Sequence, residues 1–169
     1  MAISRAVDAR VAFALAKKVV AELAPTCDRI EIAGSLRRNR PQVHDIDIVG
    51  LPSGNGSRWR SALEDMINRG SLVPVRGGDK AQCYIAAKTG IQVDIYRAEQ
   101  RTWATLLLIR TGSREHNIRL AQRARELGLK LRASGDGVET GSGDLLDVYS
   151  EEEIFSLLKL PYLTPERRS

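Results

Sequence analysis

Residues 33–50, AGSLRRNRPQVHDIDIVG, decide how the first half of the chain folds. The last seven, HDIDIVG, alternate polar with apolar side chains, which is the period of a β-strand that buries one face. Asp45 and Asp47 are therefore expected on one side of the strand, with isoleucines on the core side. Two carboxylates that close repel each other, so the pattern predicts either a raised pKa for one of them or a compensating cation.

Similar patterns predict the remaining elements of the chain. Helical spacing of apolar residues predicts five helices, over residues 7–23, 57–70, 102–110, 114–128 and 150–160. Alternation predicts further strands over residues 28–33, 81–87 and 91–96. The Gly- and Ser-rich residues 133–144 are expected to form a loop. This order of elements predicts a mixed α+β or α/β fold.

Composition limits the classes of protein to which the chain can belong. It has 169 residues, of which 43% are hydrophobic, and no apolar run of membrane-spanning length. No apolar signal segment is found near the N-terminus, and Cys27 and Cys83 lack metal-ligand spacing. We therefore expect an intracellular protein, with no membrane partner, whose cysteines are reduced.

The charge of the chain is unevenly distributed. The net charge is +5 and the pI is near 9.5, which favours an anionic partner. Residues 110–132 hold seven Lys or Arg and two Glu, whereas residues 133–169 hold three basic and eight acidic residues. The distribution predicts one basic binding face beside an acidic segment; the alternative is an exposed helix that is merely rich in arginine.

A third carboxylate is expected near the first two. In residues 91–96, IQVDIY, the same alternation places Asp94 on the face opposite its apolar neighbours. Oxygen ligands suit Mg²⁺, and three carboxylates from neighbouring strands can form the two-metal site used in phosphoryl transfer. The alternative is that these are ordinary acidic residues on the exposed face of a sheet.

The Gly-Ser turn before the first strand has the chemistry of a phosphate-binding loop. Gly34 allows the backbone to approach a phosphate closely, and Ser35 adds a hydroxyl donor. Arg37 and Arg38 supply charge and forked donors for further phosphate oxygens. Together with the carboxylates, this loop predicts a site for a nucleoside triphosphate with bound Mg²⁺.

These motifs resemble those of a known superfamily. GSLRR, DIDIVG and VDIY are similar to the nucleotidyltransferase motifs, while TGSREHNIRLAQRARELG and SEEEIFSLLKLPYLTPERR resemble the thumb of the family X DNA polymerases, related to DNA polymerase beta. The resemblance implies a nucleotidyltransferase-type palm with a mixed β-sheet flanked by helices in residues 1–100. It implies a small thumb of helices and a short sheet in residues 101–169. We expect a minimal palm-and-thumb form without the lyase, fingers and phosphoesterase domains of larger members.

The resemblance also implies roles for individual residues. Two Mg²⁺ ions, with Mn²⁺ as a substitute, would be held by the catalytic residues Asp45, Asp47 and Asp94, the last of which would also orient or deprotonate the primer 3′-hydroxyl. The nucleotide would be bound by Gly34, Ser35, Arg38, His44, Ile109, Arg110, Thr111, Gly112 and Asn117. DNA would be bound by Lys80, Gln92, Arg114, Arg119 and Arg123.

Some positions depart from the family pattern. Ile109 and Arg110 replace an aromatic pair that usually lies against the incoming sugar, and Ala121 replaces an arginine. His44 stands where a small residue is common, and contact with phosphate and simple exposure to solvent are both open. The sequence therefore predicts altered contacts with the sugar and the template.

Three functions are compatible with these features. The first is a monomeric, Mg²⁺-dependent DNA polymerase that uses deoxynucleoside triphosphates to fill short gaps in primed DNA during repair. The second is a nucleotidyltransferase acting on a non-DNA acceptor, or a template-independent terminal transferase. The third is a non-catalytic nucleic-acid-binding module, which the three clustered carboxylates argue against.

Overall fold

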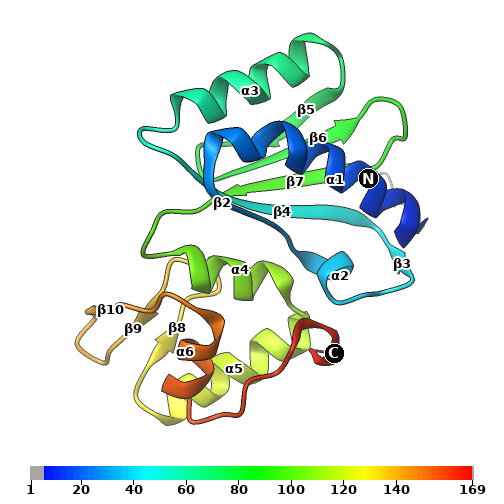
Figure 1. Cartoon of the computed structure of the whole chain (residues 1–169). Coiled ribbons are helices and arrows are strands. Elements are labelled where there is room, and N and C mark those ends of the chain that lie inside the picture. Colours follow the sequence, from blue (N-terminus) through cyan, green and yellow to red (C-terminus); the bar gives the residue numbers. More distant parts are fainter. Residues whose placement is uncertain (1–5, 169) are drawn as a thin grey trace. The chain divides into compact units, whose positions relative to one another are not determined.

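The computed structural model describes residues 6–168, and the chain divides into two compact units, Met1–Ala98 and Glu99–Ser169. The first unit contains a five-stranded sheet with helices, and the second contains three helices and a small sheet (Figure 1). The fold is therefore mixed α+β, as the sequence predicted. No helix among the described residues is long and apolar enough to cross a membrane.

The sheet of the first unit has the strand order β2-β4-β7-β6-β5. Its strands are β2 (Cys27–Ile32), β4 (Asp45–Pro52), β5 (Leu72–Gly77), β6 (Ala81–Ala86) and β7 (Gln92–Arg97). The central pair β4 and β7 is parallel, and the other pairs are antiparallel. The two strands therefore begin at the same edge of the sheet, and residues at equal distances from their starts lie beside each other.

Two helices, α1 (Ala9–Leu23) and α3 (Ser57–Asn68), cover one face of this sheet (Figure 1). Their buried side chains pack with the apolar residues of the central strands, which include Ile46, Ile48 and Val93. Burial of this face drives the register of the strands, because a slip by one residue would place the aspartates in the core. The packing thus directs the carboxylates of β4 and β7 to the other face.

The close packing of α3 on β4 requires a glycine. A Cβ atom at Gly50 would lie 2.5 Å from the ring of Trp59, which is almost fully buried. The absence of a side chain at this position therefore allows the indole to lie directly on the strand.

The structure differs from the sequence prediction at the start of the chain. The predicted helix over residues 7–23 begins at Ala9, because Asp8 caps it by accepting a hydrogen bond from the Arg10 amide at 2.8 Å. Val7 and Asp8 instead form the short strand β1, paired with β3 (Gln42–Val43). The turn η1 (Ala24–Thr26) follows the helix.

Strand β5 was not predicted, because Pro74 lies in its middle and proline is normally excluded from sheet interiors. It is tolerated because β5 is an edge strand, with an irregularity in its register between Pro74 and Arg76. Proline and a bulge both discourage pairing with another exposed edge.

The second unit contains α4 (Trp103–Thr111), α5 (Arg114–Glu126) and α6 (Glu151–Leu157). Its sheet, of order β10-β9-β8, consists of β8 (Lys130–Leu131), β9 (Val138–Glu139) and β10 (Leu145–Leu146). The expectation of a loop over residues 133–144 was therefore incomplete, because β9 lies inside it. Two residues are too short for alternation to be recognised.

Serine hydroxyls begin two of these helices. Ser113 accepts a hydrogen bond from the His116 amide at 3.2 Å, and Ser150 accepts one from the Glu153 amide at 3.1 Å. The capping pattern at Ser150 was predicted from the sequence.

The last described residues are tied to α6. After the turn η2 (Pro165–Arg167), the fully buried Arg168 donates to Glu151 Oε1 at 2.7 Å and to the Leu163 carbonyl at 2.9 Å. Its guanidinium also lies over the ring of Phe155. These contacts hold the end of the chain against the helical core of the second unit.

Candidate active site

Strand pairing brings the predicted carboxylates to one face of the first unit. Asp47 on β4 and Asp94 on β7 are direct partners in the parallel register, and Asp45 is the partner of Gln92. Partners in a parallel pair point to the same side of the sheet, and so do residues two positions apart. Asp45, Asp47 and Asp94 therefore share a face, and all three are partly exposed.

The electrostatics of Asp45 reflect this crowding. Burial raises the pKa of its carboxyl group above the ordinary value, and the negative charge of Asp94 raises it further. The positive charges of His44 and Arg38 oppose this effect, which places both residues near the carboxylate.

Asp47 is held on two sides. Tyr96, on β7, donates its hydroxyl hydrogen bond to Asp47 Oδ1 at 3.2 Å. On the other side, a Cβ atom at Gly34 would lie 2.0 Å from Asp47 Oδ2, so the carboxylate lies against the bare glycine backbone. Gly34 also has a φ of +61°, a conformation that favours glycine. This glycine is therefore required both for the turn and for the position of the carboxylate.

The turn itself is the short helix α2 (Gly34–Arg37), which follows β2 directly. The Ala33 amide donates to the Asp47 carbonyl at 2.8 Å, so the start of the turn is fixed to β4. Ser35 and Arg38 are half-buried beside it. The predicted phosphate-binding residues thus lie next to the predicted metal ligands.

Asp94 has a hydrogen-bond partner on its own strand. The side-chain amide of Gln92 donates to Asp94 Oδ2 at 2.8 Å. Gln92 was predicted to contact DNA, and the structure shows it bonded to a predicted catalytic residue. On the neighbouring strand β6, Cys83 is the direct partner of Asp94, and burial together with the Asp94 carboxylate raises the pKa of its thiol.

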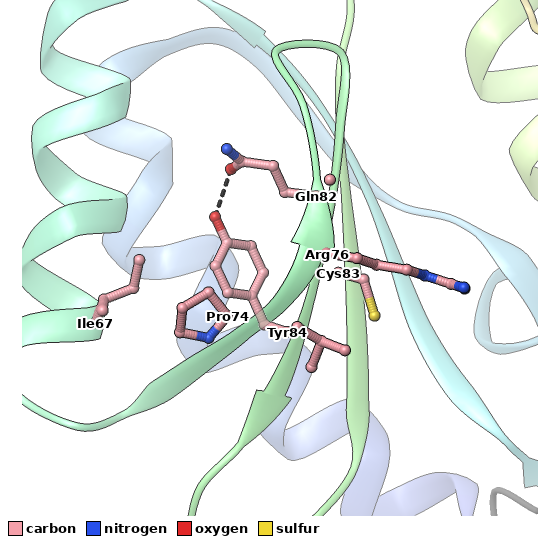
Figure 2. Close-up of a pocket in the computed structure, with 8 residues that line it drawn as sticks. Ile67, Pro74, Arg76, Gln82, Cys83 and Tyr84 are labelled. Atoms are coloured by element: carbon pink, nitrogen blue, oxygen red, sulfur yellow. Dashed lines mark hydrogen bonds between the residues drawn. The ribbon is translucent and has the colours of Figure 1, made fainter. Parts of the chain in front are cut away.

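The sheet face beside Asp94 is hollowed. A cavity of about 250 Å³ is lined by Arg76, Gly77, Ala81, Gln82, Cys83, Asp94 and Tyr96. A second cavity, of about 290 Å³, lies at the β5–β6 hairpin, where Cys83 and Arg76 point to one side and Tyr84 and Pro74 to the other (Figure 2). Tyr96 and Arg76 were not predicted as site residues. The alternation of β7 could have indicated Tyr96, because it lies two positions after Asp94.

The carboxylate oxygens are suitable ligands for a divalent metal ion, but they do not form a complete coordination shell by themselves. Within residues 6–168, no group of three or more His, Cys, Asp or Glu side chains converges closely enough to hold an ion. Mg²⁺ is commonly held by one or two carboxylates, with waters and substrate phosphates completing its coordination. The all-oxygen set and the repulsion felt by Asp45 are compatible with such a site.

The second unit contains the predicted contacts to the incoming nucleotide. Thr111 and Gly112 are buried at the turn between α4 and α5, where the Gly112–Ser113 peptide bond is cis. The Asn117 side-chain amide donates to the Ile109 carbonyl at 2.8 Å, which links α5 to the end of α4. Arg110 donates to the Ser134 carbonyl at 3.3 Å.

The residues predicted to contact DNA differ in their exposure to solvent. Lys80, at the β5–β6 turn, and Arg114 and Arg119, on α5, are exposed. Arg123 instead donates to the Leu158 carbonyl at 3.0 Å and to Glu126 at 2.9 Å. Arg123 therefore also connects α5 with the end of α6.

Similarity searches match both parts of the chain. The family described as DNA polymerase beta thumb matches residues 106–169. The chain is 32% identical to the DNA polymerase/3′-5′ exonuclease PolX of Bacillus subtilis (strain 168), in a match that covers 80% of this chain and 23% of that protein. It is 26% identical to DNA polymerase lambda of Rattus norvegicus, with 80% of this chain and 28% of that protein covered.

The chain thus spans about a quarter of the length of these two curated relatives. Both matches extend well beyond the thumb segment, since they cover 80% of the chain. The agreement of the thumb match with two polymerases shows that the chain belongs to the family X DNA polymerases.

Proposed function

We propose that this protein is a DNA-directed DNA polymerase that adds deoxynucleotides to a primer 3′-hydroxyl by two-metal-ion nucleotidyl transfer. The observation that supports it most strongly is the pairing of Asp47 with Asp94 on parallel strands, with Asp45 beside them. The adjacent Gly34 turn provides a place for the triphosphate. Acidic residues that were merely exposed on a sheet would not be expected to pair across strands beside such a turn.

In this proposal the residues of the first unit hold the reacting groups. Asp45 and Asp47 would be ligands of both Mg²⁺ ions, and Asp94 of one. When bound, Mg²⁺ supplies positive charge that offsets the charge of the triphosphate and of the transition state. Asp94 would orient or deprotonate the primer 3′-hydroxyl, and Gln92, which donates to its Oδ2 at 2.8 Å, would help to hold the carboxylate in place. Ser35 and Arg38 bind the phosphate oxygens.

The second unit would position the nucleotide and the DNA. Thr111 and Gly112 would lie against the sugar, and Asn117 would contact the base. The exposed arginines of α5, together with Lys80, would bind DNA phosphates without regard to sequence. We further propose that the protein acts inside the cell as a monomer and fills short gaps during repair.

The test is extension of a labelled primer by the purified chain with Mg²⁺. Three DNA substrates separate the alternatives: a duplex with a one-nucleotide gap, an open primer–template, and the same primer without a template. The proposal expects extension that depends on the template, with the templated nucleotide preferred and the gap used best. Mn²⁺ replaces Mg²⁺ in a parallel series.

Each other outcome identifies a different function. Equal extension with and without template would indicate a terminal transferase. DNA binding with no nucleotide incorporation on any substrate, under either metal, would indicate a binding module. Transfer of a labelled nucleotide to a non-DNA acceptor alone would indicate the second class of nucleotidyltransferase.

A further inference from the structure

We propose that Tyr96 is a positioning residue that sets the Asp47 carboxylate in place for a divalent cation before the nucleotide arrives. The inference rests on the proposed function, because it assigns Asp47 to the metal site. It concerns binding of the ion rather than the reaction, so the two can fail separately.

The geometry around Asp47 leaves its carboxylate little freedom. The Tyr96 hydroxyl donates to Oδ1 at 3.2 Å, whereas Oδ2 lies against the backbone of Gly34, where a Cβ atom would come within 2.0 Å. Rotation of the carboxylate in one direction breaks the hydrogen bond, and rotation in the other meets the turn. A carboxylate restrained on both sides loses less conformational freedom when it binds an ion.

The fold delivers Tyr96 to this position through strand periodicity. Tyr96 lies two residues after Asp94 on β7, so both side chains share the face that Asp47 also occupies. Tyr96 and Asp94 line the same cavity, of about 250 Å³. The phenol is therefore adjacent to the proposed metal site while its hydroxyl bonds to a ligand of that site.

The chemistry of the donor suits this role. A phenol is neutral at physiological pH and gives one hydrogen bond, so it orients the carboxylate without neutralising its charge. A cationic donor at the same place would compete with the ion for that charge. Hydrogen bonds to metal ligands commonly change metal affinity or activity by about 10- to 100-fold.

Binding of Mn²⁺ to the metal-free chain, followed by electron paramagnetic resonance, tests the proposal without any reaction. The variants are Tyr96→Phe, which removes only the hydroxyl, and Asp47→Asn, which removes the carboxylate charge. The matched control is Tyr84→Phe. Tyr84 lies on β6, its hydroxyl bonds to Gln82, and it points to the other side of the sheet from Cys83 (Figure 2).

The proposal expects Tyr96→Phe to weaken Mn²⁺ binding about tenfold, with urea midpoints close to wild type, and Tyr84→Phe to bind as wild type does. Asp47→Asn should lose more affinity than either. Unchanged or tighter binding by Tyr96→Phe would overturn the proposal, and so would equal weakening by Tyr84→Phe. Absence of Mn²⁺ binding by the wild type would also overturn it. Primer extension of the same preparations judges the proposed function independently.

Discussion

At the scale of single residues, the candidate site depends on how Asp47 is enclosed. The Tyr96 hydroxyl contacts one carboxylate oxygen, and the backbone of Gly34 lies against the other. The site therefore needs a hydrogen-bond donor at position 96 and no side chain at position 34. The sequence indicated Gly34 as a phosphate-binding residue. Its second role, making room for Asp47, depends on a contact between two elements and was not predictable from local sequence.

Replacement of Gly34 by alanine should therefore damage the site more than the fold. At a φ of +61° the new residue costs about 1–2 kcal/mol of unfolding free energy, and its Cβ atom would displace the Asp47 carboxylate. We expect primer extension to fall by about 100-fold or more, because misplacement of a reacting group by 1 Å has that order of effect. Gly54→Ala is the control, since Gly54 has a φ of +57° with nothing within 4 Å of the new atom. Equal activity of the two variants would contradict the role of Gly34.

His116 provides a second prediction at this scale. It is buried beside Phe155, and burial, together with the positive charges of Arg168 and Arg119, lowers its pKa from 6.5 to about 4. A hydrogen bond with Asn117 and the charge of Glu151 oppose this shift. The folded protein therefore binds fewer protons than the unfolded chain between these values. Its contribution to stability is fully present above pH 6.5 and is lost as the pH falls towards 4.

The loss should amount to about 2–3 kcal/mol over this range, because one pKa unit corresponds to about 1.4 kcal/mol. Urea unfolding of the wild type at intervals between pH 7 and 4 measures it. His116→Gln removes the titrating ring and should flatten this part of the curve. Parallel curves for wild type and His116→Gln would contradict the assignment.

At the scale of elements, helix α5 contains arginines in two kinds of environment that its sequence does not distinguish. Arg119 is exposed, whereas Arg123 donates hydrogen bonds to Leu158 and Glu126. We expect Arg119→Glu to weaken DNA binding for all sequences and to reduce the salt dependence of binding by about one counterion or more. Arg123→Glu should lower the urea midpoint as well. Fluorescence anisotropy at several salt concentrations gives the slopes, and an affinity insensitive to salt would exclude phosphate binding by this helix.

The turn between α4 and α5 gives a prediction about the sugar. Ile109 and Arg110 take the place of an aromatic pair, and Arg110 is engaged with the Ser134 carbonyl. Loss of an aromatic surface should relax steric exclusion of a 2′-hydroxyl, because packing and not hydrogen bonding would reject it. We expect Ile109→Tyr with Arg110→Phe to raise the kcat/KM ratio of dNTP over rNTP by about tenfold. An unchanged ratio on the same gapped DNA would remove these positions from sugar selection.

At the scale of the whole molecule, sequence periodicity predicted the elements that are long and amphipathic. The helices α1, α3, α4, α5 and α6 and the strands β2, β4, β6 and β7 were recognised from the spacing of their apolar residues, whereas the four-residue helix α2 was too short to be predicted. Strand β5 was missed because an edge position tolerates Pro74. The resemblance implied a short sheet in the second unit, but alternation could not locate its strands, because each has two residues. These elements are defined by pairing with distant residues, which local patterns do not contain.

The candidate site was predictable to a similar degree. Alternation placed Asp45, Asp47 and Asp94 on polar faces of two strands, and the register showed that these faces are the same one. Gln92 donates a hydrogen bond to Asp94 on the same strand, and Tyr96 donates one to Asp47 on the neighbouring strand. Both bonds depend on side-chain geometry, so only the structure revealed them. The metal-binding and catalytic roles of the three aspartates remain predictions.

The most direct test of the central claim is the single-turnover rate of nucleotide incorporation into gapped DNA by Asp94→Asn. Asp94 is the residue that the proposal assigns to the primer 3′-hydroxyl, and asparagine keeps its size while removing its charge. The matched control is Asp65→Asn, on the exposed side of α3. The account predicts a rate at least about 1,000-fold below wild type for Asp94→Asn, with an unchanged urea midpoint, and a normal rate for Asp65→Asn. A near-normal rate for Asp94→Asn would contradict the account.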